Sequence, residues 1–99
     1  MAYPGSVDTA ALAVSDNERE LRYELTRAGE LLGVLVYRPE PERARVVLVH
    51  TEIDPAYEGQ GLGNVLVKGA LDDLRERGLG VVPSCPFVRA YLRRHPEDA

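Results

Sequence analysis

The sequence predicts an α+β fold, an α/β sandwich in which an antiparallel β-meander is followed by a helix, a strand and a second helix around a mixed sheet. Three observations support this prediction. Apolar and polar side chains alternate over residues 21–25, and apolar runs follow at residues 31–37 and 46–53, each after a short turn. After Gly61 the apolar residues recur three and four apart, as in a helix that packs on one face. A proline-bounded segment at residues 86–94 predicts the second helix.

The chain of 99 residues is long enough for one hydrophobic core, so we expect residues 1–99 to form a single domain. Residues 1–13 contain Pro4 and Gly5 and predict a loose, flexible lead-in with a short strand near residues 12–15. Segments rich in turn-forming residues separate the expected strands, at positions 16–18, 28–29, 39–42 and 54–55. Short turns join antiparallel neighbours, so the strands should pair in chain order.

The second half of the chain changes to helical periodicity. Apolar residues between positions 62 and 74 lie at helical spacing and predict a helix that ends at Gly78. Residues 79–82 predict a short buried strand. Pro86 then suits the first position of a helix, with Cys85 just before it.

Composition excludes several classes of function. The net charge of −4 argues against nonspecific nucleic-acid binding, which needs a basic surface. The longest near-apolar run, residues 31–37, is far shorter than the ~18 residues of a membrane span. A single cysteine allows no internal disulfide, and one cysteine and two histidines this scattered predict no metal site. We therefore expect a cytoplasmic protein without nucleic-acid or membrane partners, a monomer or a weak oligomer.

A loop with glycines at alternate positions, YEGQGLG at residues 57–63, joins the third apolar run to the first helix. Such glycines let the backbone turn tightly and bring N–H groups up to a ligand, and the following helix N-terminus favours phosphate. The glycines alone are also compatible with an ordinary turn. Asn64 stands where the Rossmann fingerprint needs its third glycine, and no Gly-Lys-Ser/Thr of a P-loop follows. An acyl-CoA loop is the nucleotide-binding interpretation that is left.

The run HTEIDPAYEGQGLGNVLVKGALDDLRERGLGVVPSCPFVRAYLRRHPE, residues 50–97, resembles the small single-domain branch of the GNAT N-acetyltransferase superfamily. The shared features are a strand that ends in His-Thr-Glu, the loop EGxGxG, and a Cys-Pro-Phe-Val helix that runs to His-Pro-Glu. The run covers about half of the chain, and the preceding strands fit the opening meander of the family. The resemblance implies a compact GNAT-like fold with acetyl-CoA or coenzyme A as the cofactor.

The resemblance also implies which residues bind the cofactor. Backbone N–H groups of the loop would bind the pyrophosphate, and the strand at residues 50–53 would pair with the pantetheine arm. The positions concerned are Thr51, Ile53, Glu58, Gly59, Gln60, Gly61, Leu62, Gly63 and Asn64. The last helix carries Arg89, Arg93 and Arg94 without an acid, which predicts either a solvated face or a site for the charged groups of the CoA nucleotide.

Four side chains are candidates for the chemistry of amine acetylation. Cys85 precedes a helix, where partial positive charge favours thiolate, and the resemblance makes it the suspected catalytic thiol, although a lone cysteine is more often a core residue. Tyr91 stands where GNAT enzymes often carry a tyrosine that protonates the departing CoA thiolate, and it also suits the core. His50 and Glu52 lie two apart on a strand and share a face, as a proton-accepting pair or a structural one.

These features predict an acetyl-CoA-dependent N-acetyltransferase that moves an acetyl group to an amine. We expect direct attack in a ternary complex rather than an acetyl-Cys85 intermediate. The acceptor is an unidentified amine, either a small molecule or a protein lysine or N-terminus. The alternative is a CoA-binding or protein-interaction module with little or no turnover. A thiol-redox protein is a third interpretation, but the chain has no second cysteine to resolve an oxidised Cys85.

Overall fold

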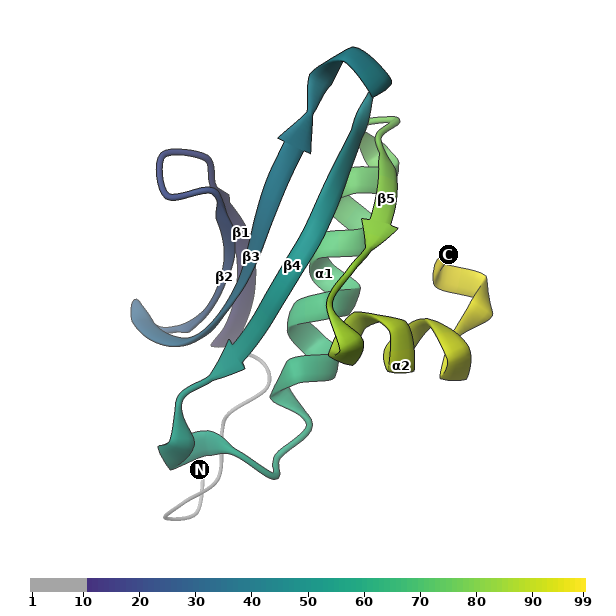
Figure 1. Ribbon diagram of the computed structural model, residues 1–99. Helices are drawn as coiled ribbons and strands as arrows, with labels where there is room; N and C mark the ends of the chain where they lie inside the picture. Colours follow the sequence, from purple (N-terminus) through teal and green to yellow (C-terminus); the bar gives the residue numbers. More distant parts are fainter. Residues whose placement is uncertain (1–10) are drawn as a thin grey trace.

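The computed structural model describes residues 11–99 and contains a five-stranded sheet with two α-helices (Figure 1). The strands lie in chain order, the first four are antiparallel neighbours, and β5 runs parallel to β4. The elements are β1 Leu12–Asn17, β2 Arg22–Arg27, β3 Glu30–Glu40, β4 Arg45–Ile53, α1 Leu62–Glu76, β5 Gly80–Pro83 and α2 Pro86–Arg94, with short 3-10 turns η2 Pro41–Arg43, η3 Pro55–Tyr57 and η4 Pro96–Asp98. The predicted α+β fold, a meander followed by α-β-α around a mixed sheet, is confirmed.

The first strand is longer than the sequence predicts. β1 includes residues 16–17, predicted to turn, and the turn falls at residues 18–21 instead. The Asp16 carboxylate accepts a hydrogen bond from the Tyr37 hydroxyl at 2.6 Å, which holds this polar residue in the strand. Of the loose lead-in predicted for residues 1–13, the first ten residues lie outside the described part of the chain, and Leu12 and Ala13 belong to β1, in agreement with the short strand predicted near residues 12–15.

The third strand passes through Pro39, where the sequence predicts a break. The ladder with β2 ends at Val36, and the last bond on that side runs from the Tyr37 N–H to the Leu21 carbonyl at 3.0 Å. Backbone alternation would point an N–H at position 39 to the same side, where β3 has no further partner. Because the missing N–H of proline costs no ladder bond there, the strand continues to Glu40.

A β-bulge at Val49 changes the course of β4. Across the β3–β4 ladder, Val36 pairs with His50 and Tyr37 pairs with Leu48, which leaves Val49 as an extra residue on β4. Such an insertion bends the strand and shifts its two-residue alternation by one position.

The bulge decides which side chains of β4 face the helices. Leu48 is buried in the core under α1, and after the shift Thr51 and Ile53, rather than the even-numbered residues, join it on this face. Ile53 packs against the core, and Thr51 contacts the first turn of α2. His50 and Glu52 therefore lie on the opposite face, with side chains 62% and 71% exposed.

β4 and β5 separate beyond Leu48. Their parallel ladder ends with Leu48 opposite Pro83, and a bond of 2.9 Å from the Cys85 N–H to the Leu48 carbonyl is the last link. The chain then turns into α2, so that the end of β4 has no strand beside it on this side (Figure 1).

The core lies between the sheet and α1, which packs on one face of the sheet and contacts all five strands. One apolar stripe of α1 is buried there: Leu62, Leu66, Val67, Ala70, Leu71 and Leu74. Gly69 lets the helix approach β1 closely, because a Cβ at this position would lie 2.6 Å from Val14 Cγ2. No helix of residues 11–99 is long and apolar enough to cross a membrane.

Candidate active site

A pocket of about 330 Å³ lies where the end of β4, the loop before α1 and the helix α2 meet. It is lined by Thr51, Ile53, Tyr57, Glu58, Gly59, Gly61, Leu62, Gly63, Asn64, Phe87 and Arg94. All of these except Tyr57 and Phe87 are positions that the sequence assigns to cofactor binding. Of the other assigned positions, Gln60, Arg89 and Arg93 are not among the lining residues.

Gly59 and Gly61 adopt a backbone conformation that favours glycine. Their φ angles are +83° and +75°, in the left-handed region. Among residues 11–99, no atom other than those of the adjoining residues lies within 4 Å of the place where a Cβ would stand at either glycine, so the backbone here borders open space. This is the arrangement needed for a ligand to approach the main chain closely.

The N-terminus of α1 presents backbone donors to the pocket that the helix itself does not use. Gly61 is the N-cap, and the first intrahelical bond runs from the Val65 N–H to the Gly61 carbonyl at 3.4 Å. The N–H groups of the four residues 61–64 therefore have no partner within the helix. The first turn holds no acidic residue that would offset the positive end of the helix dipole. Donors of this kind fit a phosphate or pyrophosphate group.

Gly63 serves a different purpose from the other two glycines of the loop. A Cβ at Gly63 would lie 2.5 Å from Phe87 Cζ, so the glycine makes room for the aromatic ring. Phe87 is still 39% exposed and forms an apolar wall of the pocket. The contact ties the start of α2 to the start of α1.

The three arginines of α2 have different environments. Arg94 lines the pocket and donates from Nη2 to Asn64 Oδ1 at 3.1 Å, which holds the guanidinium beside the loop. Arg89 donates instead to the carbonyl oxygens of Pro83 and Ser84, at 3.2 and 2.7 Å, and Arg93 is exposed. Arg94 is therefore the arginine of α2 best placed to meet an anion in the pocket.

Two aromatic residues of the pocket were not predicted from the sequence as binding residues. Tyr57 is held by its hydroxyl, which donates to Glu30, and by Arg27, whose guanidinium lies 5.5 Å from the ring centroid. Phe87 belongs to the Cys-Pro-Phe-Val motif, and its apolar character suggests only a core position. The exposure of Phe87 depends on the close approach of α2 to Gly63, which no local pattern reveals.

The free edge of β4 supplies further backbone donors. The Asp54 N–H points toward β3, where it donates to the Leu32 carbonyl at 2.8 Å. Because N–H groups alternate along a strand, those of Thr51 and Ile53 point away from β3, toward α2 and the pocket.

Cys85 lies directly behind the pocket wall. It is only 2% exposed, and its Sγ is 3.3 Å from Thr51 Oγ1. Burial would raise the pKa of the Cys85 thiol, but the Thr51 hydroxyl and the backbone N–H groups of Val88, Phe87 and Thr51 outweigh it, so the pKa is lowered overall. The first-turn N–H groups act at a distance, since none makes a capping hydrogen bond to the side chain.

His50 and Glu52 lie side by side on the sheet face away from the helices. His50 Nε2 is 3.8 Å from Glu52 Oε2, and both side chains are largely exposed. The bulge at Val49 thus puts this pair and the pocket residues Thr51 and Ile53 on opposite faces of the same strand.

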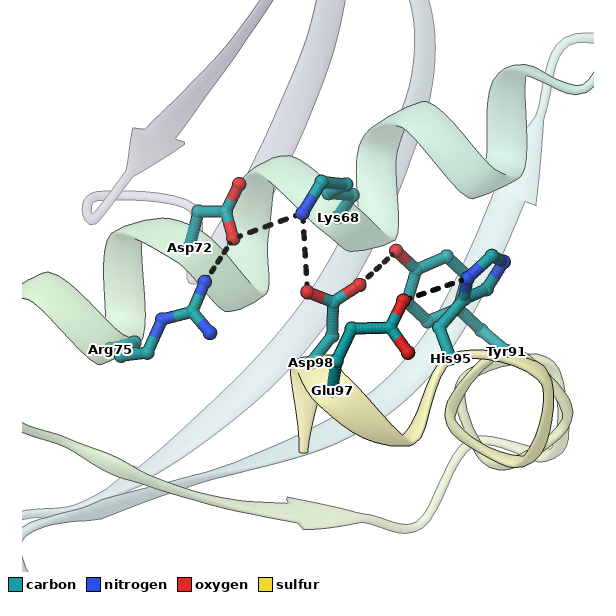
Figure 2. Close-up of polar contacts among 7 residues, drawn as sticks. All are labelled: Lys68, Asp72, Arg75, Tyr91, His95, Glu97 and Asp98. Carbon is teal, nitrogen blue, oxygen red and sulfur yellow. Dashed lines mark hydrogen bonds and ion pairs between the residues drawn. The ribbon is translucent and has the colours of Figure 1, made fainter.

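Tyr91 is buried away from the pocket-lining residues. Figure 2 shows its hydroxyl directed at Asp98, to which it donates at 2.6 Å, while Lys68 Nζ bonds the other carboxylate oxygen of Asp98 at 3.1 Å. Burial and the bond to Asp98 raise the pKa of Tyr91. A hydroxyl bound in this way is a weaker acid than an ordinary tyrosine, and the geometry favours a structural role in joining α2, η4 and α1.

Asp98 also belongs to a group of possible metal ligands. Ligand-type atoms of His95, Glu97 and Asp98 lie within 4.8 Å of one another. The Asp98 carboxylate is already engaged by the Tyr91 hydroxyl and the Lys68 ammonium (Figure 2). Because both oxygens of Asp98 already have partners within the fold, the arrangement favours a structural cluster over a metal site.

Replacing Tyr91 with phenylalanine tests the structural role. We expect Tyr91→Phe to lower the melting temperature by roughly 4–8 °C at neutral pH, because the Asp98 carboxylate loses a short hydrogen bond. The bond lowers the pKa of Asp98, so its contribution is present above the pKa of an unfolded Asp, about 3.9, and is lost as the pH falls through the lower folded pKa. Thermal unfolding of both proteins across that range measures this. Equal melting temperatures at neutral pH would contradict the assignment.

The fold and this pocket define a class of protein. A helix N-terminus whose first N–H groups have no intrahelical partner, a glycine loop and a separated strand edge meet in one pocket. Residues 22–99 match the family model described as GCN5-related N-acetyl-transferase, and the chain belongs to this family.

Two kinds of characterised relatives show similarity over much of the chain. The [ribosomal protein bS18]-alanine N-acetyltransferase of Escherichia coli K12 is 31% identical over 81 residues, which are 82% of this chain and 52% of that protein. Protein NATD1 of mouse is 36% identical over 64 residues, 65% of this chain and 57% of that protein, and human NATD1 is similar at 36% over the same length. The chain spans little more than half the length of these relatives.

Proposed function

We propose that this protein is an acetyl-CoA-dependent N-acetyltransferase that transfers an acetyl group to an amine by direct attack in a ternary complex. The observation that carries the proposal is the set of N–H groups at residues 61–64, which have no partner within the helix, border open space at Gly61 and belong to residues that line the same pocket as Arg94. These groups suit the pyrophosphate of coenzyme A. Membership of the GCN5-related family supports acetyl-CoA as the donor.

The end of β4 is suited to the thioester half of the donor. The N–H of Ile53 points away from β3 and can donate to the acetyl carbonyl oxygen, where negative charge develops during attack. The apolar wall of Phe87 and Ile53 fits the pantetheine arm. An amine held close to the thioester needs no covalent enzyme intermediate, since orientation alone supplies much of the rate enhancement.

The amine must lose a proton before or during attack, and we assign this step to the pair His50 and Glu52. Both are exposed on the sheet face that α1 leaves open, and an acceptor on this face would meet the thioester at the end of β4, where no strand lies beside it on the β5 side. We expect His50→Gln and Glu52→Gln to lower kcat while the affinity for acetyl-CoA stays unchanged. The alanine N-acetyltransferase activity of the bacterial relative makes a peptide N-terminus one acceptor to test, beside small amines and lysine peptides.

Two measurements on the same preparation test the proposal. Calorimetric titration measures the binding of acetyl-CoA and coenzyme A, and a panel of amines is then assayed by release of the CoA thiol. Binding together with turnover on at least one amine is the expected result. Binding without turnover on any amine would favour the alternative, a CoA-binding module, and the absence of binding would contradict both.

Mass spectrometry distinguishes direct attack from an acetyl-Cys85 intermediate. Cys85 is 2% exposed and separated from the pocket by Thr51, so we expect no stoichiometric acetyl adduct after mixing with acetyl-CoA alone. Cys85→Ala should keep reduced but measurable turnover. An adduct on Cys85 that is discharged by the amine at the catalytic rate would show that the covalent route operates.

A further inference from the structure

The departing CoA thiolate needs a proton, and the pocket contains few groups that can supply one. The family resemblance suggests Tyr91 for this role. Its hydroxyl, however, donates a hydrogen bond to Asp98, and Tyr91 is not among the residues that line the pocket. Of the lining side chains at the end of β4, Ile53 has no proton to give, whereas Thr51 carries a hydroxyl.

Thr51 stands between the pocket and the buried sulfur of Cys85. Thr51 is one of the residues that line the pocket, and its Oγ1 is 3.3 Å from Cys85 Sγ, a distance at which either atom can donate. Cys85 does not line the pocket itself and is 2% exposed. The thiol can therefore exchange a proton with the pocket through the Thr51 hydroxyl.

The surroundings of the sulfur suit a group that gives up a proton and holds the resulting charge. The Thr51 hydroxyl and the backbone N–H groups of Thr51, Phe87 and Val88 all favour the thiolate. These groups come from β4 and from the first turn of α2, and none carries a formal charge. Such neutral donors stabilise a buried anion without an ion pair.

We propose that Thr51 is the catalytic residue that protonates the leaving thiolate, and that Cys85 is the proton source acting through it. The inference rests on the proposed function, because it requires the thioester to lie beside Thr51.

Each proton and electron pair has a defined destination in this reaction. The amine nitrogen forms a bond to the acetyl carbon, the carbon–sulfur bond breaks, and its electron pair stays on the CoA sulfur. That sulfur takes the hydroxyl proton of Thr51, and Thr51 takes the thiol proton of Cys85, which becomes a thiolate. The proton lost by the amine leaves through His50 and Glu52 or water, and Cys85 regains a proton from solvent after the products depart.

Three variants test the relay. Thr51→Val keeps the shape of the side chain and removes the hydroxyl, Thr51→Ser restores the hydroxyl, and Thr26→Val removes a threonine hydroxyl from β2, away from the pocket. For each protein we would measure kcat and KM for acetyl-CoA with an amine that the wild type acetylates, and the affinity for coenzyme A by calorimetry. The ultraviolet absorbance of the thiolate against pH reports the pKa of Cys85 directly, because the chain has one cysteine.

We expect Thr51→Val to lower kcat about a hundredfold, the lower end of what a general acid contributes, with the affinity for coenzyme A within about twofold of the wild type. The pKa of Cys85 should rise, since the thiolate loses its side-chain donor. Thr51→Ser should recover most of the kcat and of the thiol titration, and Thr26→Val should match the wild type in both.

Three results would overturn the relay, and they can be distinguished from one another. A wild type that turns over normally, with Thr51→Val equal to it in kcat, would remove the role of Thr51 and leave the proposed function intact. A wild type that acetylates no amine would overturn the proposed function and the relay together. If Thr51→Ser, which keeps a hydroxyl, loses as much kcat as Thr51→Val, the hydroxyl is not the group responsible for the effect.

Discussion

Replacing Gly61 with valine is expected to weaken the binding of acetyl-CoA at least tenfold, about 1.4 kcal/mol, while the protein remains folded. At φ +75° a β-branched residue is strained, and relieving the strain would turn the N–H groups of the loop away from the pocket. The added side chain would also enter the open space beside the Gly61 backbone. Calorimetric titration of the variant and the wild type measures the effect.

Gly78 offers a matched control for this substitution. It has φ +72°, no atom of another described residue beyond its chain neighbours within 4 Å of the place where a Cβ would stand, and a position between α1 and β5, at the opposite end of α1 from the pocket. Gly78→Val should therefore lose stability from the same kind of strain and keep its affinity for acetyl-CoA. If the two variants lose affinity equally, the effect comes from stability and the loop is not the binding site.

Removing the guanidinium of Arg94 should lower the affinity for coenzyme A by about tenfold or more. Arg94 lines the pocket and is oriented by Asn64, and a charge-assisted hydrogen bond to phosphate contributes about 1.5–3 kcal/mol. The affinity of the wild type should fall as salt rises, and the affinity of Arg94→Ala should fall less steeply. Titrations at several ionic strengths measure both effects.

The neighbouring arginine provides the control for charge alone. Arg93 is exposed and does not line the pocket, so Arg93→Ala changes the net charge by the same amount without removing a pocket group. We expect its affinity for coenzyme A to stay within about twofold of the wild type at moderate salt. Equal losses of affinity in Arg93→Ala and Arg94→Ala would mean that the arginines of α2 attract coenzyme A by their positive charge alone, without a specific contact from Arg94.

The order of the elements and the loop could be predicted from the sequence because their signals are local. Alternating side chains, the glycines of residues 57–63 and the proline that begins α2 each act through their own backbone preferences. The extension of β3 through Pro39 could not be predicted, since it depends on where the neighbouring strand β2 ends its ladder.

The arrangement of side chains around the site depends on tertiary contacts that no local pattern contains. The bulge at Val49 arises in the pairing of β3 with β4, and it decides that Thr51 rather than His50 faces the pocket. The bond from Tyr91 to Asp98 depends on how η4 folds back on α2. A residue type at a family position suggests a role, but its partner in space decides which role it can have.

Coenzyme A added to the isotopically labelled protein tests the central claim most directly, through the chemical shifts of the backbone amides. The proposal predicts that the largest changes occur at the loop and helix start, residues 59–64, with further changes at Thr51 and Ile53 on the edge of β4. The N–H groups of the loop and helix start are expected to bind the pyrophosphate, the N–H of Ile53 is expected to bind the thioester, and Thr51 lies beside it in the pocket wall. Saturable changes confined to another surface, such as the groove beside β5 that includes Leu79 and Val81, with the loop unaffected, would contradict it.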